Sequence, residues 1–239
     1  MMDVGRHPNI RLFTNSVLAG LEGRAGDFKA RIREHPRYVS HELCTGCGAC
    51  AKHCPIEVPS EFDYGMGMRK AAYCPFPQAV PRTYIIDREN CNDCGICIEK
   101  CPSEAINLDD PGRDTDLEVG SVIVATGFDV YDASAISSYG YGLYDNVLTN
   151  MQLERILNAS GPTRGHIARP SDHKVPRKIA FIQCVGSRGE GKEAGCQYCS
   201  RFCCMNAIKD CVLAKQHEPD IEEMTIFYID LRASGKGFE

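Results

Sequence analysis

Residues 44–55 read CTGCGACAKHCP and residues 91–102 read CNDCGICIEKCP, and these two stretches decide how the first half of the chain folds. Each has the spacing C-x2-C-x2-C-x3-C-P, which sets three cysteines close together on a tight loop and a fourth just before a proline. Gly46, Gly48 and Gly95 leave room for a bulky metal group and expose backbone N–H groups that can donate to its sulfur atoms. The two stretches therefore predict two metal centres.

The same spacing is typical of bacterial ferredoxins, in which three thiolates bind one [4Fe–4S] cluster and the fourth binds the other. This crossed pattern assigns one cluster to Cys44, Cys47, Cys50 and Cys101, and the other to Cys91, Cys94, Cys97 and Cys54. The alternative is a pair of four-cysteine zinc sites. Zinc sites of this kind usually pair two C-x2-C hooks, so the spacing favours iron–sulfur clusters.

The composition supports metal ligation in a reducing compartment. The chain has 239 residues and 15 cysteines, an odd number that falls mostly in short-spaced runs, which suits metal binding better than a disulfide framework. A reducing cytoplasm with little oxygen is the expected location. The net charge of −5 argues against nucleic acid and anionic membranes as partners. No segment approaches the roughly 20 apolar residues of a membrane span.

A third group of cysteines follows a different spacing. The segment 196–206 reads CQYCSRFCCMN, and Cys184 lies upstream of it at the end of an apolar run, 178–183. Three interpretations stay open from the residues alone: a third metal site, a thiol/disulfide centre using Cys203 and Cys204, or a patch of small buried side chains. Cys74 stands alone and is interpreted as a small buried hydrophobic residue.

The pattern around this group predicts a βαβ unit. A strand over 178–183, a helix over 204–217 and a strand over 224–232 follow one another at the required spacing. In a dinucleotide-binding fold the loop after the first strand would carry G-x-G-x-x-G, a motif that the chain lacks. A looser match at 189–194 begins well past the strand and is interpreted as a flexible loop.

Elsewhere the pattern predicts mostly strands. Residues 9–39 read as three strands joined by turns, and 84–86 as a short strand. An acidic linker is expected over 109–116, followed by a buried parallel strand over 121–125. Thr149 and Gln152 form a capping-box pattern that predicts a helix through about Asn158.

Several long strings resemble one known family. The two cysteine runs, PFPQAVPRTY, VIVATGFDVYD, LERILNASGPT, KIAFIQCVGSR and TIFYIDLRASGKGFE together look like the A-type iron–sulfur subunit of heterodisulfide reductase, and the likeness covers the whole chain. The resemblance implies a thioredoxin-reductase-like FAD fold interrupted by an inserted two-cluster ferredoxin domain, in which the flavin bifurcates electrons. It also implies that FAD-binding sequence precedes residue 1 and that more sequence follows residue 239, so the chain is expected to be a fragment or one piece of a split subunit.

The resemblance carries further site residues and cofactors. It implies a third [4Fe–4S] cluster on Cys184, Cys199, Cys203 and Cys204, with Cys196 as the alternate ligand. It also implies an FAD contact at Ala125, Thr126 and Gly127.

The expected fold class is α/β plus α+β, in four parts. Residues 1–40 are expected to be a β-segment of the FAD domain, 41–109 the two-cluster ferredoxin domain, 110–170 the end of the FAD domain with a helix and linker, and 171–239 a pyridine-nucleotide-like βαβ unit with the third cysteine group.

The expected function is electron transfer between a flavin and partner iron–sulfur subunits. The resemblance implies B-type and C-type heterodisulfide reductase subunits, a hydrogenase- or formate dehydrogenase-linked donor, and ferredoxin as partners. Whether the chain is an enzyme by itself stays open, and catalysis by the chain alone is not expected. The alternatives are a stand-alone ferredoxin-like carrier and a thiol/disulfide oxidoreductase using Cys203 and Cys204.

Overall fold

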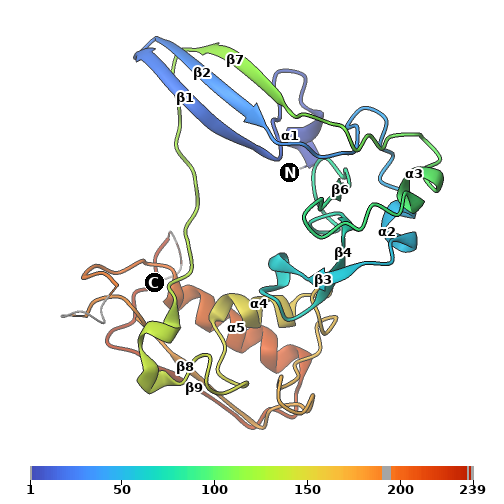
Figure 1. The fold of residues 1–239 in the computed structure, drawn as a ribbon. Helices are drawn as coiled ribbons and strands as arrows, with labels where there is room; N and C mark the ends of the chain where they lie inside the picture. The colour runs from blue at the N-terminus through green and yellow to red at the C-terminus, as the bar shows by residue number, and fades with distance from the viewer. Residues whose placement is uncertain (1, 190–194, 236, 238–239) are drawn as a thin grey trace. The chain divides into compact units, whose positions relative to one another are not determined.

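A computed structural model describes residues 2–189, 195–235 and 237 of the chain. The chain divides into two compact units, Met1–Thr126 and Gly127–Glu239 (Figure 1).

The elements of the first unit are short. In chain order they are α1 (Met2–Arg6), β1 (Ser16–Arg24), β2 (Asp27–Glu34), α2 (Ala49–His53), β3 (Glu57–Pro59), η1 (Glu61–Asp63), β4 (Met68–Lys70), β5 (Ala72–Tyr73), β6 (Ile85–Ile86), α3 (Ile96–Glu99) and β7 (Arg113–Val119). Those of the second unit are η2 (Ala133–Ala135), η3 (Ser137–Tyr139), α4 (Asn150–Leu157), β8 (Lys178–Ile182), α5 (Cys203–His217) and β9 (Glu223–Phe227).

A three-stranded antiparallel sheet, in the order β1-β2-β7, combines segments from both sides of the cysteine runs. One of the strands predicted within 9–39 is confirmed as β2, where Ala30 is buried and its neighbours Lys29 and Arg31 are exposed. On the exposed side Arg31 lies opposite Asp116 and Arg33 opposite Asp114, and each pair forms an ion pair at 3.0 Å. The region with the cysteine runs is therefore inserted between two strands of one sheet.

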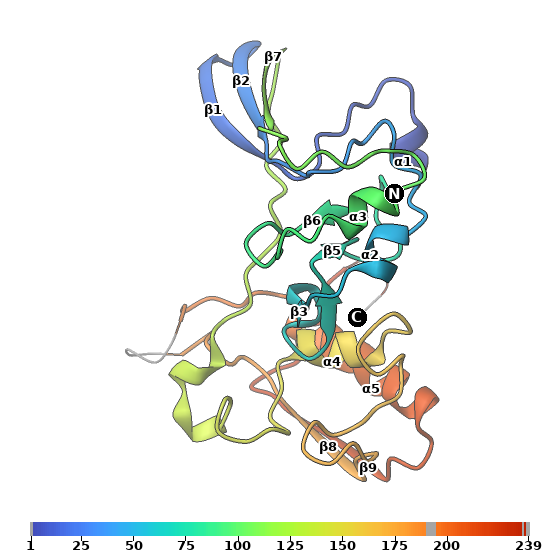
Figure 2. The same cartoon turned by 45° about the vertical axis from the view of Figure 1, so that its right-hand side comes forward.

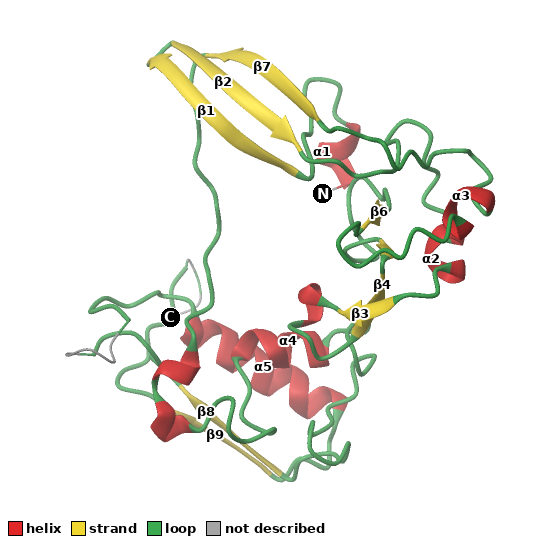
Figure 3. Cartoon of the chain, viewed as in Figure 1, coloured by secondary structure: helices red, strands yellow, loops and turns green. Residues whose placement is uncertain are grey.

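The inserted region consists largely of loops (Figure 3). Its two one-turn helices, α2 and α3, contact each other and each begins after a glycine in the left-handed conformation, Gly48 or Gly95 (Figure 2). The two-stranded pairs β3–β4 and β5–β6 lie between them in the chain. Five buried residues form the core of this region: Val39, Cys50, Ala72, Ile86 and Ala105. Five further cysteines of the two runs pack against this core.

The second unit contains the predicted βαβ unit. Strands β8 and β9 pair in parallel, and α5 connects them. The predicted capping box at Thr149 is present and opens α4, which packs against α5. Leu157 of α4, Ile167, Ala214 of α5 and Ile221 form the buried cluster.

Four predictions about local structure were wrong, at least in part. Residues 121–125 form no strand, and Ile123 and Val124 are 90% and 78% exposed, because no strand in the described part of the chain pairs with them. The predicted linker 109–116 includes the start of β7, since its acidic residues pair with arginines of β2. Residues 9–13 are coil, so only two of the three expected N-terminal strands form. The last strand is shorter than 224–232 and ends at Phe227.

Residues 190–194, which hold most of the looser glycine pattern, lie outside the described residues. Among the helices that the structure describes, none is both long enough and apolar enough to cross a membrane.

Candidate iron–sulfur centres

The first predicted cluster site gathers cysteines from both runs. The Cys50 thiol is buried at the start of α2, and it interacts electrostatically with Cys44, Cys101 and Cys47. Burial, with a smaller contribution from the three neighbouring thiols, raises the pKa of Cys50 to about 12. A thiol with this pKa stays protonated at neutral pH until a metal displaces the proton. The four cysteines that the spacing assigns to one centre are thus neighbours in the fold.

The second predicted site is a small concave pocket lined by thiols. All four assigned cysteines line it, together with buried apolar residues from β5 and β6: Cys54, Cys91, Cys94, Cys97, Ala72 and Ile86. Cys54 comes from the first run and the other three from the second, which is the crossed arrangement of a two-cluster ferredoxin. A concave, thiol-lined site of this kind fits an iron–sulfur cluster.

Backbone N–H groups point at the sulfur atoms, as iron–sulfur ligands require. The Ala105 N–H donates to Cys101 Sγ at 3.3 Å, and the Asp93 N–H donates to Cys91 Sγ at 3.4 Å. For Cys101, burial raises the pKa, but hydrogen bonds from Ala105 and Ser103 outweigh it, so the net pKa lies below the usual value. These bonds favour the thiolate form that binds iron.

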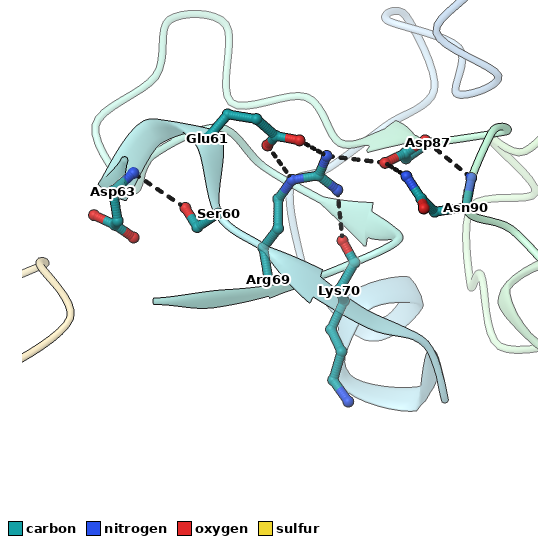
Figure 4. A network of polar contacts seen from close by, with 7 residues as sticks. All are labelled: Ser60, Glu61, Asp63, Arg69, Lys70, Asp87 and Asn90. Atoms are coloured by element: carbon teal, nitrogen blue, oxygen red, sulfur yellow. Dashed lines mark hydrogen bonds and ion pairs between the residues drawn. The ribbon is translucent and has the colours of Figure 1, made fainter. Parts of the chain in front are cut away.

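An ion-pair network fixes the turn that leads into the second site (Figure 4). Arg69 of β4 donates to both carboxylate oxygens of Glu61 at 2.5 Å and to Asp87 at 2.9 Å, and its guanidinium lies 3.9 Å from the Tyr73 ring centroid. Asp87 in turn accepts hydrogen bonds from the backbone and side chain of Asn90, at 3.3 and 2.9 Å. Asn90 immediately precedes Cys91. The network therefore sets where the first ligand of the second run lies.

Three cysteines of the third group meet at the N-terminus of α5. The Cys203 thiol interacts with the thiols of Cys204 and Cys184, and it accepts a hydrogen bond from the Cys184 backbone N–H. The Arg201 N–H donates to Cys199 Sγ at 3.3 Å. Cys196 lies in a bridge with Ser187 and donates to the Tyr198 carbonyl at 3.4 Å. Cys184, Cys203 and Cys204 are brought together. Cys196 lies beside Ser187 in the loop that follows Cys184, and the contact described for Cys199 lies within its own segment.

The backbone at Cys184 is unusual. Its φ of +61° lies in the left-handed region, which costs a non-glycine residue about 1–3 kcal/mol. Arg188 interacts with the Cys184 thiol and also pairs with Asp230. The Cys184 thiol lies close to Cys203, the first residue of α5. A third set of thiols is thus present where a phosphate-binding glycine loop would lie in a nucleotide-binding fold.

The residues expected to contact FAD have no partner surface within the described part of the chain. Ala125, Thr126 and Gly127 are exposed coil, and a Cβ built on Gly127 would meet no described heavy atom within 4 Å. An FAD contact at these three residues stays a prediction.

Two further side chains lie near the first site: Cys74, which was predicted to be a small buried residue, and Arg37, which had no signal in the sequence. Cys74 is half-buried, donates to the Phe76 carbonyl at 3.4 Å and lies near Cys44, so it packs beside the first site as a small side chain. The Arg37 guanidinium is partly buried near Cys74, Tyr73 and Cys44.

In the ranges 2–189 and 195–235, no set of three or more His, Cys, Asp or Glu side chains is arranged to hold a metal ion as it stands.

Comparison with known proteins agrees with this geometry. A family model described as a 4Fe-4S dicluster domain matches residues 43–106, which span both cysteine runs. Over its whole length the chain is 56% identical to an A-type iron–sulfur subunit of the CoB–CoM heterodisulfide reductase of Methanopyrus kandleri. It is 53% identical to the A-type subunit of the H(2)/formate:CoB-CoM heterodisulfide,ferredoxin reductase of Methanococcus maripaludis. It is 44% identical to the A-type subunit of the Ferredoxin/F(420)H(2)-dependent CoB-CoM heterodisulfide reductase of Methanosarcina acetivorans.

The chain spans 36% of the length of the first two relatives and 30% of the third. Identity of this level along all 239 residues cannot arise from the cysteine runs alone, because they make up a small part of the aligned sequence. The matched sequence includes the dicluster domain, the flanking sheet and the βαβ unit, and the chain is therefore homologous over its whole length to a segment that makes up about a third of the A-type heterodisulfide reductase subunits.

Proposed function

We propose that this chain transfers electrons within a heterodisulfide reductase-type complex. The observation that carries the proposal is the crossed arrangement of the two runs, in which Cys101 joins Cys44, Cys47 and Cys50 while Cys54 lines the pocket of the other three. When bound, each [4Fe–4S] cluster accepts and releases one electron. The chain supplies the thiolates, the N–H donors and the burial that set the potential at which this happens.

We also propose a third [4Fe–4S] cluster held by Cys184, Cys199, Cys203 and Cys204. Three of these residues meet at the start of α5, and the family resemblance supplies Cys199 as the fourth ligand, with Cys196 as the alternate. Cys203 and Cys204 are adjacent, and a disulfide between neighbours in a helical turn would be strained, which favours ligation over dithiol chemistry.

The flavin and the partners follow from the family rather than from this chain's own residues. The relatives' names describe heterodisulfide reductases that use hydrogen, formate or ferredoxin. By analogy, the electrons would pass between a flavin on a thioredoxin-reductase-like fold, B-type and C-type subunits, and a donor of one of these kinds, in the cytoplasm. A Cβ built on Gly127 would meet no described heavy atom within 4 Å, so FAD bound there would need further protein surface to contact.

Anaerobic reconstitution with iron and sulfide tests the proposal. Three clusters would give about 12 iron and about 12 acid-labile sulfide per chain, and two clusters about 8 of each. Zinc in place of iron, or the absence of labile sulfide, contradicts the electron-transfer function.

A thiol/disulfide oxidoreductase using Cys203 and Cys204 is the second candidate, because the two thiols interact with each other at the start of α5, even though a disulfide between neighbours would be strained. The variant Cys204→Ser separates the two. Loss of one cluster's electron paramagnetic resonance (EPR) signal indicates ligation, whereas unchanged iron content with loss of disulfide reduction indicates a dithiol centre. Cys211, on the same helix but outside the group, provides the matched control as Cys211→Ser.

A further inference from the structure

The two ferredoxin-type sites differ in the charges around them, and this difference rests on Arg37. The Arg37 backbone is fixed on both sides, since its N–H donates to Asp110 at 2.9 Å and its carbonyl accepts from Ile86 at 3.1 Å. Its guanidinium donates to Thr14 Oγ1 at 2.8 Å. The side chain is therefore held in one place beside the first site.

The charge of Arg37 is not neutralised by an ion pair. No carboxylate in the described part of the chain lies within ion-pair distance of its guanidinium, and Glu34 and Asp110 act on it only from further away. Burial lowers the pKa of Arg37, whereas nearby Cys74, Tyr73 and Cys44 raise it. An arginine stays protonated in proteins, so a positive charge is present at the first site at all relevant pH values.

A second arginine covers the loop of the first site. A Cβ built on Gly46 would lie 2.7 Å from the Arg82 carbonyl oxygen and 3.4 Å from its Cγ. A Cβ built on Gly48 would lie 2.8 Å from the Tyr84 hydroxyl oxygen. Thr83, between Arg82 and Tyr84, is buried, and its hydroxyl is hydrogen-bonded to His41 Nδ1 at 3.0 Å. Residues 82–84 therefore press against the first loop. The Arg82 side chain itself is exposed, so water screens its charge more than that of Arg37.

Among the residues that the structure describes, the second site has neither an unpaired arginine beside it nor a segment packed against its loop. A Cβ built on Gly95 would meet no heavy atom within 4 Å, although Gly95 has the same left-handed conformation as Gly46. Arg88, which interacts with Cys91, is paired with Asp93. A paired charge exerts a much weaker field than an unpaired one at the same distance.

We infer that Arg37, assisted by Arg82, raises the reduction potential of the cluster held by Cys44, Cys47, Cys50 and Cys101 above that of the cluster held by Cys91, Cys94, Cys97 and Cys54. The inference rests on the proposed function, because it needs both clusters. Reduction adds one negative charge to a cluster, and a fixed positive charge in a partly buried place stabilises that charge. The first site thus has the higher affinity for an electron.

The test is a redox titration of the reconstituted chain followed by EPR spectroscopy, comparing the parent with Arg37→Gln. The midpoint of the higher-potential cluster is expected to move to more negative values, while the other midpoint stays in place. Arg37→Lys keeps the charge and is expected to keep most of the parent midpoint. Arg33→Gln removes an exposed, paired arginine and is the matched control for overall charge.

Two further variants keep the test decisive. Arg82→Gln is expected to move the same midpoint in the same direction, but by a smaller amount. This variant provides a test even if Arg37→Gln lowers the yield of folded chain. Cys47→Ser and Cys94→Ser identify the signals, since the higher-potential signal must change in the first and persist in the second. The inference is overturned by unchanged midpoints, by equal shifts of the two midpoints, or by a higher potential at the cluster of Cys91. In each of these cases normal iron and sulfide contents leave the proposed function standing. A chain that binds no cluster overturns both.

Discussion

At the scale of single residues, Asp210 of α5 is a fully buried ionisable group of the second unit. Its side chain is fully buried, and neither carboxylate oxygen has a hydrogen-bond partner among the described residues. Burial, with a smaller contribution from Glu154 of α4, raises the pKa of Asp210 from 3.8 to about 7, although Lys209 at 3.6 Å acts to lower it. The folded state therefore binds a proton that the unfolded state releases.

We expect Asp210→Asn to remove a pH dependence of stability. In the parent the folded state is destabilised progressively as pH rises from about 4 to about 7, because the folded chain holds more protons than the unfolded chain over this window. At about 1.4 kcal/mol per pKa unit the loss at pH 7 amounts to a few kcal/mol. Urea midpoints between pH 5 and pH 7 measure it. They are expected to fall with rising pH in the parent and in the exposed control Asp220→Asn, and to stay level in Asp210→Asn.

The glycines of the two cysteine loops allow a second prediction. Gly46 and Gly95 both have φ near +70°, so alanine costs about 1–3 kcal/mol of backbone strain at either position. Only at Gly46 does the new Cβ also meet a backbone oxygen, that of Arg82 at 2.7 Å. Gly46→Ala is expected to lower the iron content and the urea midpoint more than Gly95→Ala. Equal losses would show that the segment 82–84 does not press against the first loop.

At the scale of secondary-structure elements, the Arg69 network is the main polar contact between β4 and the turn before Cys91. Arg69 and Asp87 are each 12% exposed, so removing the guanidinium would leave a nearly buried carboxylate unpaired. We expect Arg69→Met to destabilise the chain by roughly 3 kcal/mol. The neighbouring Lys70→Met breaks the more exposed pair with Glu57 and is expected to cost less than about 1 kcal/mol.

Urea unfolding of both variants measures this difference, and EPR spectra show its local consequence. Arg69→Met is expected to broaden the signal of the cluster at Cys91, since Asp87 would no longer be held against Asn90. A normal spectrum together with a normal midpoint would mean that Asn90 positions Cys91 without the arginine.

The elements show which parts of the fold are readable from sequence. The capping box at Thr149 and the parallel βαβ unit were predicted because the signals are local: a cap with its partner three residues on, and apolar runs at fixed spacing. The cysteine runs were readable for the same reason. The start of β7 was missed because Asp114 and Asp116 read as a solvated linker, although the alternation Asp-Thr-Asp-Leu-Glu-Val has the period of a strand.

The other misses depend on contacts that no local pattern records. Residues 121–125 have the composition of a buried strand, but burial requires neighbouring strands, and composition does not say where these come from. Arg37 gave no signal because the bonds that hold it come from Thr14, Ile86 and Asp110, all far away in the sequence. The strained Cys184 is likewise visible only in the backbone.

At the scale of the whole molecule, the chain consists of two units joined at Thr126 and Gly127, within an exposed apolar segment. All eight cysteines of the ferredoxin-type runs belong to the first unit, and all five of the third group belong to the second. The units can therefore be separated by a protease without dividing any proposed cluster between fragments.

Thermolysin, which cuts before large apolar residues, is expected to cleave first within 121–130, because Ile123 and Val124 are the most exposed large apolar residues of the described chain. After anaerobic reconstitution, the fragment that ends near residue 122 should carry about eight iron and the fragment from there to residue 239 about four. Separation by size under argon, followed by iron and sulfide assays, gives both numbers. A second fragment without iron would remove the cluster proposed at Cys184, Cys199, Cys203 and Cys204 and favour dithiol chemistry at Cys203 and Cys204. A first cut between residues 44 and 101 would instead contradict the compactness of the first unit, since the thiols of both runs pack around one core.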